Sequence, residues 1–290
     1  MSRMELPNHG VMPEAHPAPL TMDGSAMLHQ MFRFDWPAWR ALDVAERKRV
    51  LTEAKAFLAQ REKGSTMGGH PNQTALFSQL GHKGDLMLLH FADTMEALAK
   101  LERDIARLEL SDYLEPSESY VSVVELGLYE SSARIFAQLA SEGVEPHSEI
   151  WNSRVAEVVE RQSAAMTPRL YPAIPESKYL CFYPMDRKRG EQNNWYTVPM
   201  AERQRMMHDH GMIGRRYAED VRQIISGSIG FDDWEWGVDL FAENPKVFKK
   251  LIYEMRFDEA SAIYAEFGPF YIGVRLPVEK LGEWLAPGEK

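Results

Sequence analysis

The chain has 290 residues, of which 43 are acidic and 33 basic, and its formal net charge is −10. This length supports a substantial hydrophobic core in one or two domains, and the acidic balance argues against nucleic acid as the main partner. Cys181 is the single cysteine, which excludes an intrachain disulfide and a zinc or iron–sulfur site built from several cysteines.

The first 26 residues contain several prolines and histidines and are predicted to form a flexible tail. No continuous apolar segment follows Arg3, so the pattern of a signal peptide is missing. No apolar run elsewhere approaches the roughly 20 residues of a transmembrane helix. We therefore expect a protein without a transmembrane segment, and the cytoplasm suits a chain that forms no disulfide.

The first half of the ordered chain is predicted to have the element order βαββαβ. Gly81 and Gly84 bound a short turn between two strands, which is typical of a hairpin. Asp93 or Thr94 is placed to cap the helix that follows. We interpret residues 27–130 as an N-terminal ferredoxin-like half. Its expected elements are strands at 26–34, 74–80, 85–91 and 120–128, with helices at 45–61 and 95–108.

Residues 131–167 differ from the segments on either side. A helix is expected around residues 155–162, and the flanks are charged and contain proline and serine. We interpret this segment as a connector with little core of its own.

Residues 168–290 repeat the order of the first half. Asn244 is predicted to cap a helix with Pro245 at its first position. The pattern predicts an α+β fold, in which two ferredoxin-like βαββαβ halves form a dimeric α+β barrel. The expected elements are strands at 179–183, 221–229, 234–241 and 270–274, with helices at 201–217 and from 245 to 255.

His210 lies on the apolar face of the first of these helices, whereas His208 lies on the polar face. The two side chains therefore cannot bind one ion from a regular helix. His210 is either a hydrogen-bonded core residue or a metal ligand. Gly211 and Gly214 each cost the helix about 0.5–1 kcal/mol relative to alanine. Such a cost favours a broad, flat ligand, and a haem with His210 as axial ligand would fit.

Polar and aromatic residues on the neighbouring strands form a second group of candidates. Gln223 shares a strand face with apolar residues and needs a hydrogen-bond partner, from either the backbone or a ligand. Trp234 and Trp236 share one face of the next strand, as core or as the wall of a pocket. Tyr183 ends a strand, where its phenol lies either beside a solvated basic loop or at a binding site.

Isolated arginines form a third group. Arg169 and Arg256 stand among apolar residues, and Arg187 opens a short basic run. Arginine is well suited to bind carboxylates because its planar guanidinium donates hydrogen bonds in pairs. Several arginines in one half of an acidic protein therefore suggest an acidic small molecule as ligand.

Several long motifs of the second half match a known pattern. They are Tyr183-Pro184-Met185, Asn194-Trp195-Tyr196, Asp209-His210-Gly211, and residues 223–236, 253–259 and 267–270. These segments resemble the chlorite dismutase-like superfamily, and within it the coproheme decarboxylases, which use peroxide in the last step of the coproporphyrin route to haem. The resemblance is dense over residues 169–273 and looser over residues 34–128.

The resemblance implies a function and a set of roles. The substrate would be iron-coproporphyrin III (coproheme), which is also the redox centre; hydrogen peroxide would be the oxidant and haem b the product. His210 would be the proximal iron ligand, and Tyr183 the residue that becomes a radical. Gln223 would lie on the distal side, Trp234 beside the porphyrin, and Arg169, Arg256 and Ser261 at propionates. A homopentamer and transient contact with ferrochelatase are also implied.

The sequence departs from the family at a further position that the resemblance assigns to propionate binding. The usual lysine four residues after the tyrosine is replaced by Arg187, which can hold a propionate but is a poor proton donor. Lys188 is an alternative proton donor. Three other functions stay open: a chlorite dismutase or haem peroxidase on the same scaffold, a haem-binding chaperone or sensor without turnover, and a ferredoxin-like interaction module without a ligand.

Overall fold

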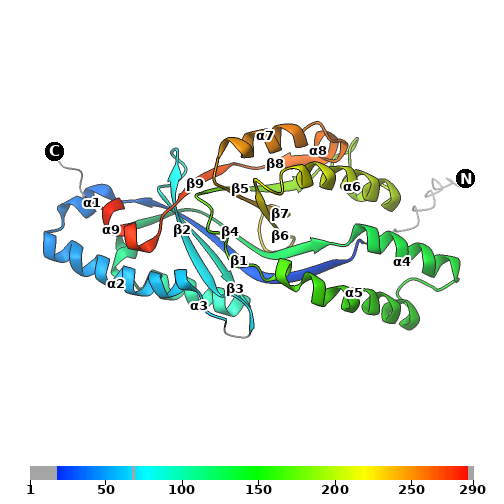
Figure 1. The fold of residues 1–290 in the computed structure, drawn as a ribbon, viewed down its shortest axis with the longest axis horizontal. Coiled ribbons are helices and arrows are strands. Elements are labelled where there is room, and N and C mark those ends of the chain that lie inside the picture. The colour runs from blue at the N-terminus through cyan, green and yellow to red at the C-terminus, as the bar shows by residue number, and fades with distance from the viewer. Residues whose placement is uncertain (1–17, 67–68, 287–290) are drawn as a thin grey trace, which may run out of the picture.

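The computed structural model describes residues 18–66 and 69–286 (Figure 1). In the first half the elements are β1 (Thr21–Phe34), α1 (Trp36–Ala41), α2 (Val44–Lys63), β2 (Gln73–Leu80), β3 (Leu86–Ala92), α3 (Met95–Ala106) and β4 (Leu114–Gly127). Next come α4 (Tyr129–Ser141) and α5 (Glu149–Leu170). In the second half they are β5 (Tyr179–Arg187), α6 (Met200–Arg216), β6 (Arg222–Gly227), β7 (Trp236–Ala242), α7 (Lys246–Met255), α8 (Glu259–Tyr264), β8 (Ala265–Phe267), β9 (Tyr271–Arg275) and α9 (Leu281–Trp284).

The strands form one antiparallel sheet that closes on itself. Its order is β7-β6-β4-β1-β3-β2-β9-β5-β8, and β5 also pairs with β7, which completes the ring. Within each half the strands follow the ferredoxin-like order: β4-β1-β3-β2 in the first and β9-β5-β7-β6 in the second. The halves meet where β4 pairs with β6 and where β2 pairs with β9. The predicted α+β fold is therefore confirmed.

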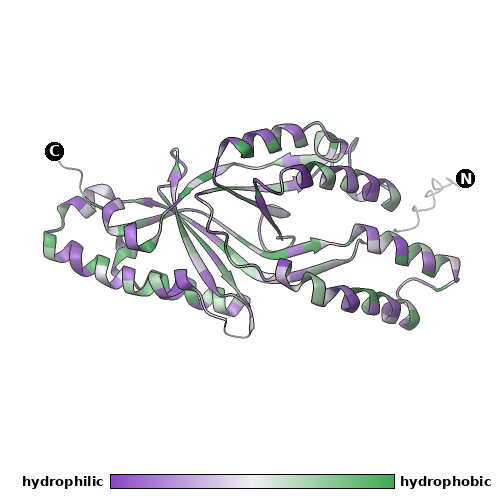
Figure 2. Cartoon of the chain, in the orientation of Figure 1, coloured by the Kyte–Doolittle hydropathy of each residue, from purple (hydrophilic) through white to green (hydrophobic). Residues whose placement is uncertain are grey.

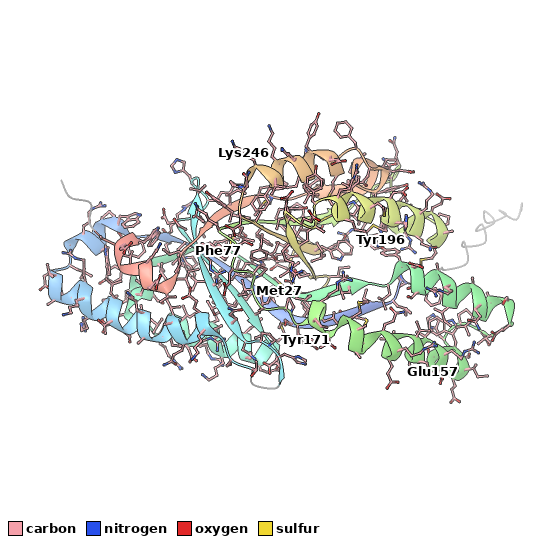
Figure 3. All side chains as sticks on the ribbon, viewed as in Figure 1. Met27, Phe77, Glu157, Tyr171, Tyr196 and Lys246 are labelled. Carbon is pink, nitrogen blue, oxygen red and sulfur yellow. The ribbon has the colours of Figure 1, made fainter. Side chains whose placement is uncertain are left out.

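Alternation along the strands divides each half of the sheet into an inner and an outer face. Met27 and Phe77, labelled in Figure 3, belong to a buried cluster that fills the interior of the barrel and contains residues of both halves. The outer faces are covered by helices, with α2 and α3 on the first half and α6 and α7 on the second (Figure 1). These helices alternate apolar and polar residues along their length (Figure 2). In the described part of the chain, no helix has the length and hydrophobicity needed to cross a bilayer.

Local capping explains where several helices begin. The side chain of Thr94 accepts a hydrogen bond from the backbone of Ala97 at the start of α3, so Thr94 is the N-cap rather than Asp93. Asn244 also accepts a hydrogen bond, from the backbone of Lys246. The helix begins at Lys246, one residue after the predicted start, and Pro245 takes the cap position.

The segment interpreted as a connector is a pair of long helices with a core of its own. Ser148 caps α5, and α4 and α5 pack through Ile135, Leu139, Trp151 and Val155. The prediction of a single short helix with little core was wrong, because the charged residues between these apolar positions belong to the outer faces of two amphipathic helices. Figure 1 shows the pair at the opposite end of the molecule from α1 and α2.

Several strand boundaries also differ from the prediction. β4 begins at Leu114 rather than at residue 120, and β5 continues to Arg187, so Tyr183 lies within the strand instead of ending it. β1 begins at Thr21, inside the predicted tail, because its first residues pair with β4 across a register shift between Asp23 and Ala26; residues 1–17 lie outside the described residues. β6 ends at Gly227, and β7 begins at Trp236 rather than Trp234. Ser228 leaves the strand and its hydroxyl donates to the carbonyl of Val121 on β4, which starts the turn early.

His90 on β3 gives the fold a predicted acid sensitivity. The side chain is fully buried, and its nitrogens lie 2.9 Å from Thr74 Oγ1 and 3.1 Å from Gln30 Oε1. Burial, reinforced by electrostatic interactions with Arg61 and His29, lowers the pKa of His90 to about 3. The unfolded chain binds a proton near pH 6.5, whereas the folded protein does not until about pH 3.

We expect this single group to reduce the free energy of unfolding by about 1.4 kcal/mol per pH unit as the pH falls below about 6.5. Denaturant unfolding followed as a function of pH measures the slope, and His90→Gln removes the group while keeping a polar side chain. The slope of the free energy of unfolding against pH should be smaller in the variant by about 1.4 kcal/mol per pH unit, which corresponds to the loss of one titrating proton. An identical slope in both proteins would contradict the assignment.

Candidate functional site

His210 on α6 is held by a carboxylate that lies 48 residues later in the sequence. Its Nδ1 lies 2.9 Å from Asp258 Oδ2, and the imidazole is about one-quarter exposed while the Asp258 side chain is buried. Asp258 is the N-cap of α8, where its other oxygen accepts a hydrogen bond from the backbone of Ser261. This local role fixes the carboxylate in one orientation. His208 is exposed, as the helical pattern predicted.

Ser261 completes this cluster. Its hydroxyl donates to Asp258 Oδ2 at 3.1 Å and lies 3.4 Å from His210 Nδ1. Burial acts to raise the pKa of Asp258, but the hydrogen bonds from His210 and Ser261 outweigh it and hold that pKa below its usual value. Asp258 is therefore a stable carboxylate that accepts a hydrogen bond from Nδ1 of His210. In this structure the Ser261 hydroxyl therefore lies on the Nδ1 side of the imidazole, where its partner is Asp258, and its predicted contact with a propionate stays a prediction.

The surroundings of His210 show whether the site fits an iron porphyrin. A hydrogen bond from Nδ1 to a carboxylate fixes the tautomer and makes the other nitrogen a better donor to a metal. Nε2 of His210 has no hydrogen-bond partner among the described residues. Within the same residues, no group of three or more His, Cys, Asp or Glu side chains is arranged to hold a bare ion. The donor set fits an iron porphyrin.

Tyr183 lies in the layer between the outer face of the second-half sheet and helices α6 and α7. The side chain is 4% exposed, and its ring centroid lies 4.7 Å from that of Phe270 and 5.7 Å from that of Phe267. Burial raises the pKa of Tyr183 well above its usual value, an effect that the charges of Arg187 and Arg256 only partly oppose. The phenol is therefore neutral. Its hydroxyl has no hydrogen-bond partner among the described residues.

Gln223 on β6 points to the same layer and is half-buried. A Cβ at Gly214, one turn after His210, would lie 3.5 Å from Gln223 Nε2 and 3.5 Å from Met255 Cε. These are ordinary contact distances, and a Cβ at Gly211 would meet nothing within 4 Å. The structure contains no clash that requires either glycine, so the idea that they make room for a flat ligand stays a prediction.

Arg187 at the end of β5 is buried and its donors are already engaged. One terminal nitrogen donates to the carbonyl of Ala260 at 2.7 Å, and the other lies 3.4 Å from the sulfur of Met207. The guanidinium stacks over Trp195, with its carbon 4.7 Å from the ring centroid. Burial lowers the pKa of Arg187. In this structure Arg187 joins β5 to α6 and α8, and Lys188 is half-buried beside it.

The remaining predicted residues, Arg256, Trp234 and Arg169, lie in three different places in the fold. Arg256 ends α7 and is exposed, with its guanidinium carbon 5.1 Å from the ring centroid of Phe267. Trp234 precedes β7 and packs against the interior cluster, close to Gly268. Arg169 is exposed near the end of α5, where it contacts Met166. The structure therefore groups His210, Ser261, Tyr183, Gln223, Arg187 and Arg256 around α6, α7 and α8, and leaves Arg169 on the surface of another helix.

Sequence reasoning missed two carboxylates. Asp258 was part of a quoted motif, and its capping position before α8 was readable, but nothing local indicated that it reaches His210. Glu235 is buried and accepts a hydrogen bond from the backbone of Arg187 at 2.9 Å, while its own backbone donates to Asp186. It fixes the end of β5, four residues after Tyr183.

Comparisons with known proteins agree with this architecture. The family model for chlorite dismutase matches residues 47–276. A haem-binding protein from Thermus thermophilus is 37% identical, with 92% of this chain and 97% of that chain covered and a TM-score of 0.77. Chlorite dismutase from Candidatus Nitrospira defluvii in complex with imidazole is 16% identical, covering 91% and 95% with a TM-score of 0.66, which is a likeness of fold alone.

Proposed function

The chain belongs to the chlorite dismutase family, and from this premise we propose that it binds an iron porphyrin at His210 and oxidatively decarboxylates coproheme. The observation that carries the proposal is the pairing of His210 with Asp258, which leaves Nε2 of His210 open to a metal. The same half of the chain contains Tyr183, a buried and neutral phenol. The haem-binding relative from Thermus thermophilus supports the choice of ligand.

The protein's part in this reaction is binding, orientation and proton management. In this proposal Asp258 orients His210 and strengthens it as a donor, and Arg256, whose charge acts on Tyr183, binds a carboxylate. When bound, the iron porphyrin supplies two-electron oxidation by hydrogen peroxide, and the same molecule carries the propionates that are oxidised. For each propionate, one peroxide becomes two waters, the side chain loses CO2 and two electrons, and a vinyl group remains.

Tyr183 is suited to remove a hydrogen atom from the propionate, the step that links peroxide oxidation to loss of CO2. A phenol whose pKa is raised by burial does not ionise first, so it must give up its electron and its proton together. The resulting oxygen radical can take a hydrogen atom from the β-carbon of a neighbouring propionate, which restores the phenol. Phe267 and Phe270 keep water from the ring. A protein that only carried haem would need no such phenol.

The experiment that tests this function is direct. Pure protein is mixed with coproheme, titrated with hydrogen peroxide, and the porphyrin is analysed by mass spectrometry. We expect stepwise loss of two carboxyl groups to give haem b. Bound but unreacted coproheme would favour a haem-binding protein without turnover, and no binding would favour an interaction module.

Gln223 separates this function from chlorite dismutation. A neutral amide cannot supply the positive charge that stabilises a chlorine oxyanion, and chlorite dismutases resemble this chain but carry an arginine at the distal position. We expect negligible oxygen release from chlorite, measured with an oxygen electrode on haem-loaded protein, and an increase in Gln223→Arg. Robust release by the wild-type protein would assign it to chlorite dismutation instead.

Three further parts of the proposal concern the setting of the reaction. We propose a cytoplasmic homopentamer that makes transient contact with a ferrochelatase. Sedimentation of the purified protein tests the assembly, and pull-down with a ferrochelatase tests the contact.

A further inference from the structure

Arg203 on α6 is a buried cation without a partner among the described residues. Arg203 is 5% exposed, and its Nε is enclosed without a hydrogen bond. No carboxylate of the described residues lies within salt-bridge distance of the guanidinium, and no hydrogen bond to its side chain is formed among them. Two other arginines of the same helix are paired, Arg205 with Glu202 and Glu259, and Arg216 with Glu254. Arg215 is exposed and contacts the sulfur of Met212.

Enclosing part of a guanidinium without a counter-charge is costly, because burial removes water from the enclosed Nε of Arg203 and no hydrogen bond replaces it. Buried charges in folded proteins are normally paired. A position that keeps such a group is therefore a candidate binding site for an anion that arrives with a ligand. Buried arginine suits a carboxylate in particular, because its planar guanidinium can donate two parallel hydrogen bonds.

Arg203 lies on the same face of α6 as His210. The residues are seven apart, which is about two turns and about 10 Å along the helix axis. Met207 lies between them on this face and contacts Arg187. The inward face of α6 therefore presents an unpaired cation, a sulfur atom and the candidate iron ligand in one line.

The surroundings of Arg203 include a second cation, Arg187, and one carboxylate, Glu125, which forms no salt bridge with Arg203. Burial raises the pKa of Tyr129 at the start of α4, while its hydrogen bond with Trp195 and the positive charges of Arg203 and Arg187 oppose that rise. Both guanidiniums therefore lie within electrostatic range of one phenol. Glu125 acts on the same phenol, but its carboxylate is hydrogen-bonded to the indole of Trp236. Tyr196, labelled in Figure 3, lies beside α6.

We propose that Arg203 binds a carboxylate of the porphyrin whose iron His210 holds, and so acts as a specificity residue for a substrate with several propionates. This inference rests on the proposed function. It adds a carboxylate-binding residue that the sequence pattern did not indicate. It also explains why a chain with a net charge of −10 keeps an unpaired cation in its interior.

Two measurements test this inference without using activity. The first is the melting temperature of the ligand-free protein. Arg203→Met replaces the charge by an apolar side chain of similar length, so the melting temperature should be unchanged or higher. If Arg203 were only a structural residue, the same variant would melt at a lower temperature, and that result would overturn the proposal.

The second measurement is porphyrin affinity. We expect Arg203→Met to bind coproheme about tenfold more weakly and metal-free coproporphyrin III to a similar extent, while Arg203→Lys retains most of the affinity. The tetramethyl ester of coproheme, which has no carboxylates, should bind both proteins equally. Equal losses for the acid and the ester, or no loss for either, would show that Arg203 does not bind a carboxylate.

Controls separate this inference from the proposed function. Arg205→Gln, on the exposed face of the same helix, should leave all three affinities unchanged. His210→Ala should weaken coproheme binding but not that of the metal-free porphyrin, whereas Arg203→Met should weaken both. If the wild-type protein binds coproheme but does not decarboxylate it, the proposed function fails while the comparison of acid and ester still decides the role of Arg203. If the wild-type protein binds neither porphyrin, both proposals fail.

Discussion

Replacement of His210 by alanine is expected to weaken coproheme binding by at least about a hundredfold and to shift the Soret band. Loss of an outer-shell partner of a metal ligand typically costs 10–100-fold in metal affinity, and loss of the ligand itself should cost at least as much. The imidazole is the group that the structure prepares for this role, because Asp258 holds Nδ1 and no described residue occupies Nε2. Spectral titration with coproheme measures both the affinity and the band.

The matched control is His208→Ala in the same helix. His208 lies on the exposed face two residues earlier, so its loss changes the local sequence but removes nothing from the site. The affinity and the Soret band of this variant should equal those of the wild-type protein. An unchanged spectrum in His210→Ala, or an equal change in both variants, would mean that His210 is a hydrogen-bonded core residue and that another group binds the iron.

The fold could be predicted from the sequence because its signals are local and repeated. Each half shows the same succession of strand, helix, hairpin and capped helix, and two such units can bury their sheets by closing on each other. The pair α4 and α5 was not predicted because its core is formed between two helices. Ile135 and Trp151 become neighbours only after the turn near Gly143 brings the helices together.

The site was predictable where helical periodicity decides the outcome and unpredictable where distant segments meet. The pattern placed His210 on the inner face of α6 and His208 on the outer face. Nothing in it indicated Asp258, 48 residues later, or the engagement of Arg187 by the carbonyl of Ala260. Arg203 shares the face of His210 and could have been noticed from spacing alone. Its lack of a partner among the described residues, which is what makes it a candidate, is a property of the tertiary structure.

Tyr183→Phe is expected to bind coproheme but to form no haem b. Phenylalanine keeps the ring that packs against Phe267 and Phe270, and no described residue loses a hydrogen bond when the hydroxyl is removed. The melting temperature should therefore stay close to that of the wild-type protein. Loss of one hydrogen bond to a propionate would cost roughly 0.5–1.5 kcal/mol, or around tenfold in affinity. Such a loss is too small to abolish product at saturating substrate.

The distinction between binding and chemistry comes from the O–H bond. Tyrosine, unlike phenylalanine, has an O–H proton that can leave together with an electron, so peroxide should oxidise or bleach the bound porphyrin in Tyr183→Phe without release of CO2. Tyr179→Phe is the matched control, because Tyr179 lies on the same strand and packs against the same cluster. That variant should decarboxylate coproheme at close to the wild-type rate, as measured by CO2 release and by mass spectrometry of the porphyrin. If Tyr183→Phe also forms haem b at the wild-type rate, a different residue connects the oxidant to the propionate.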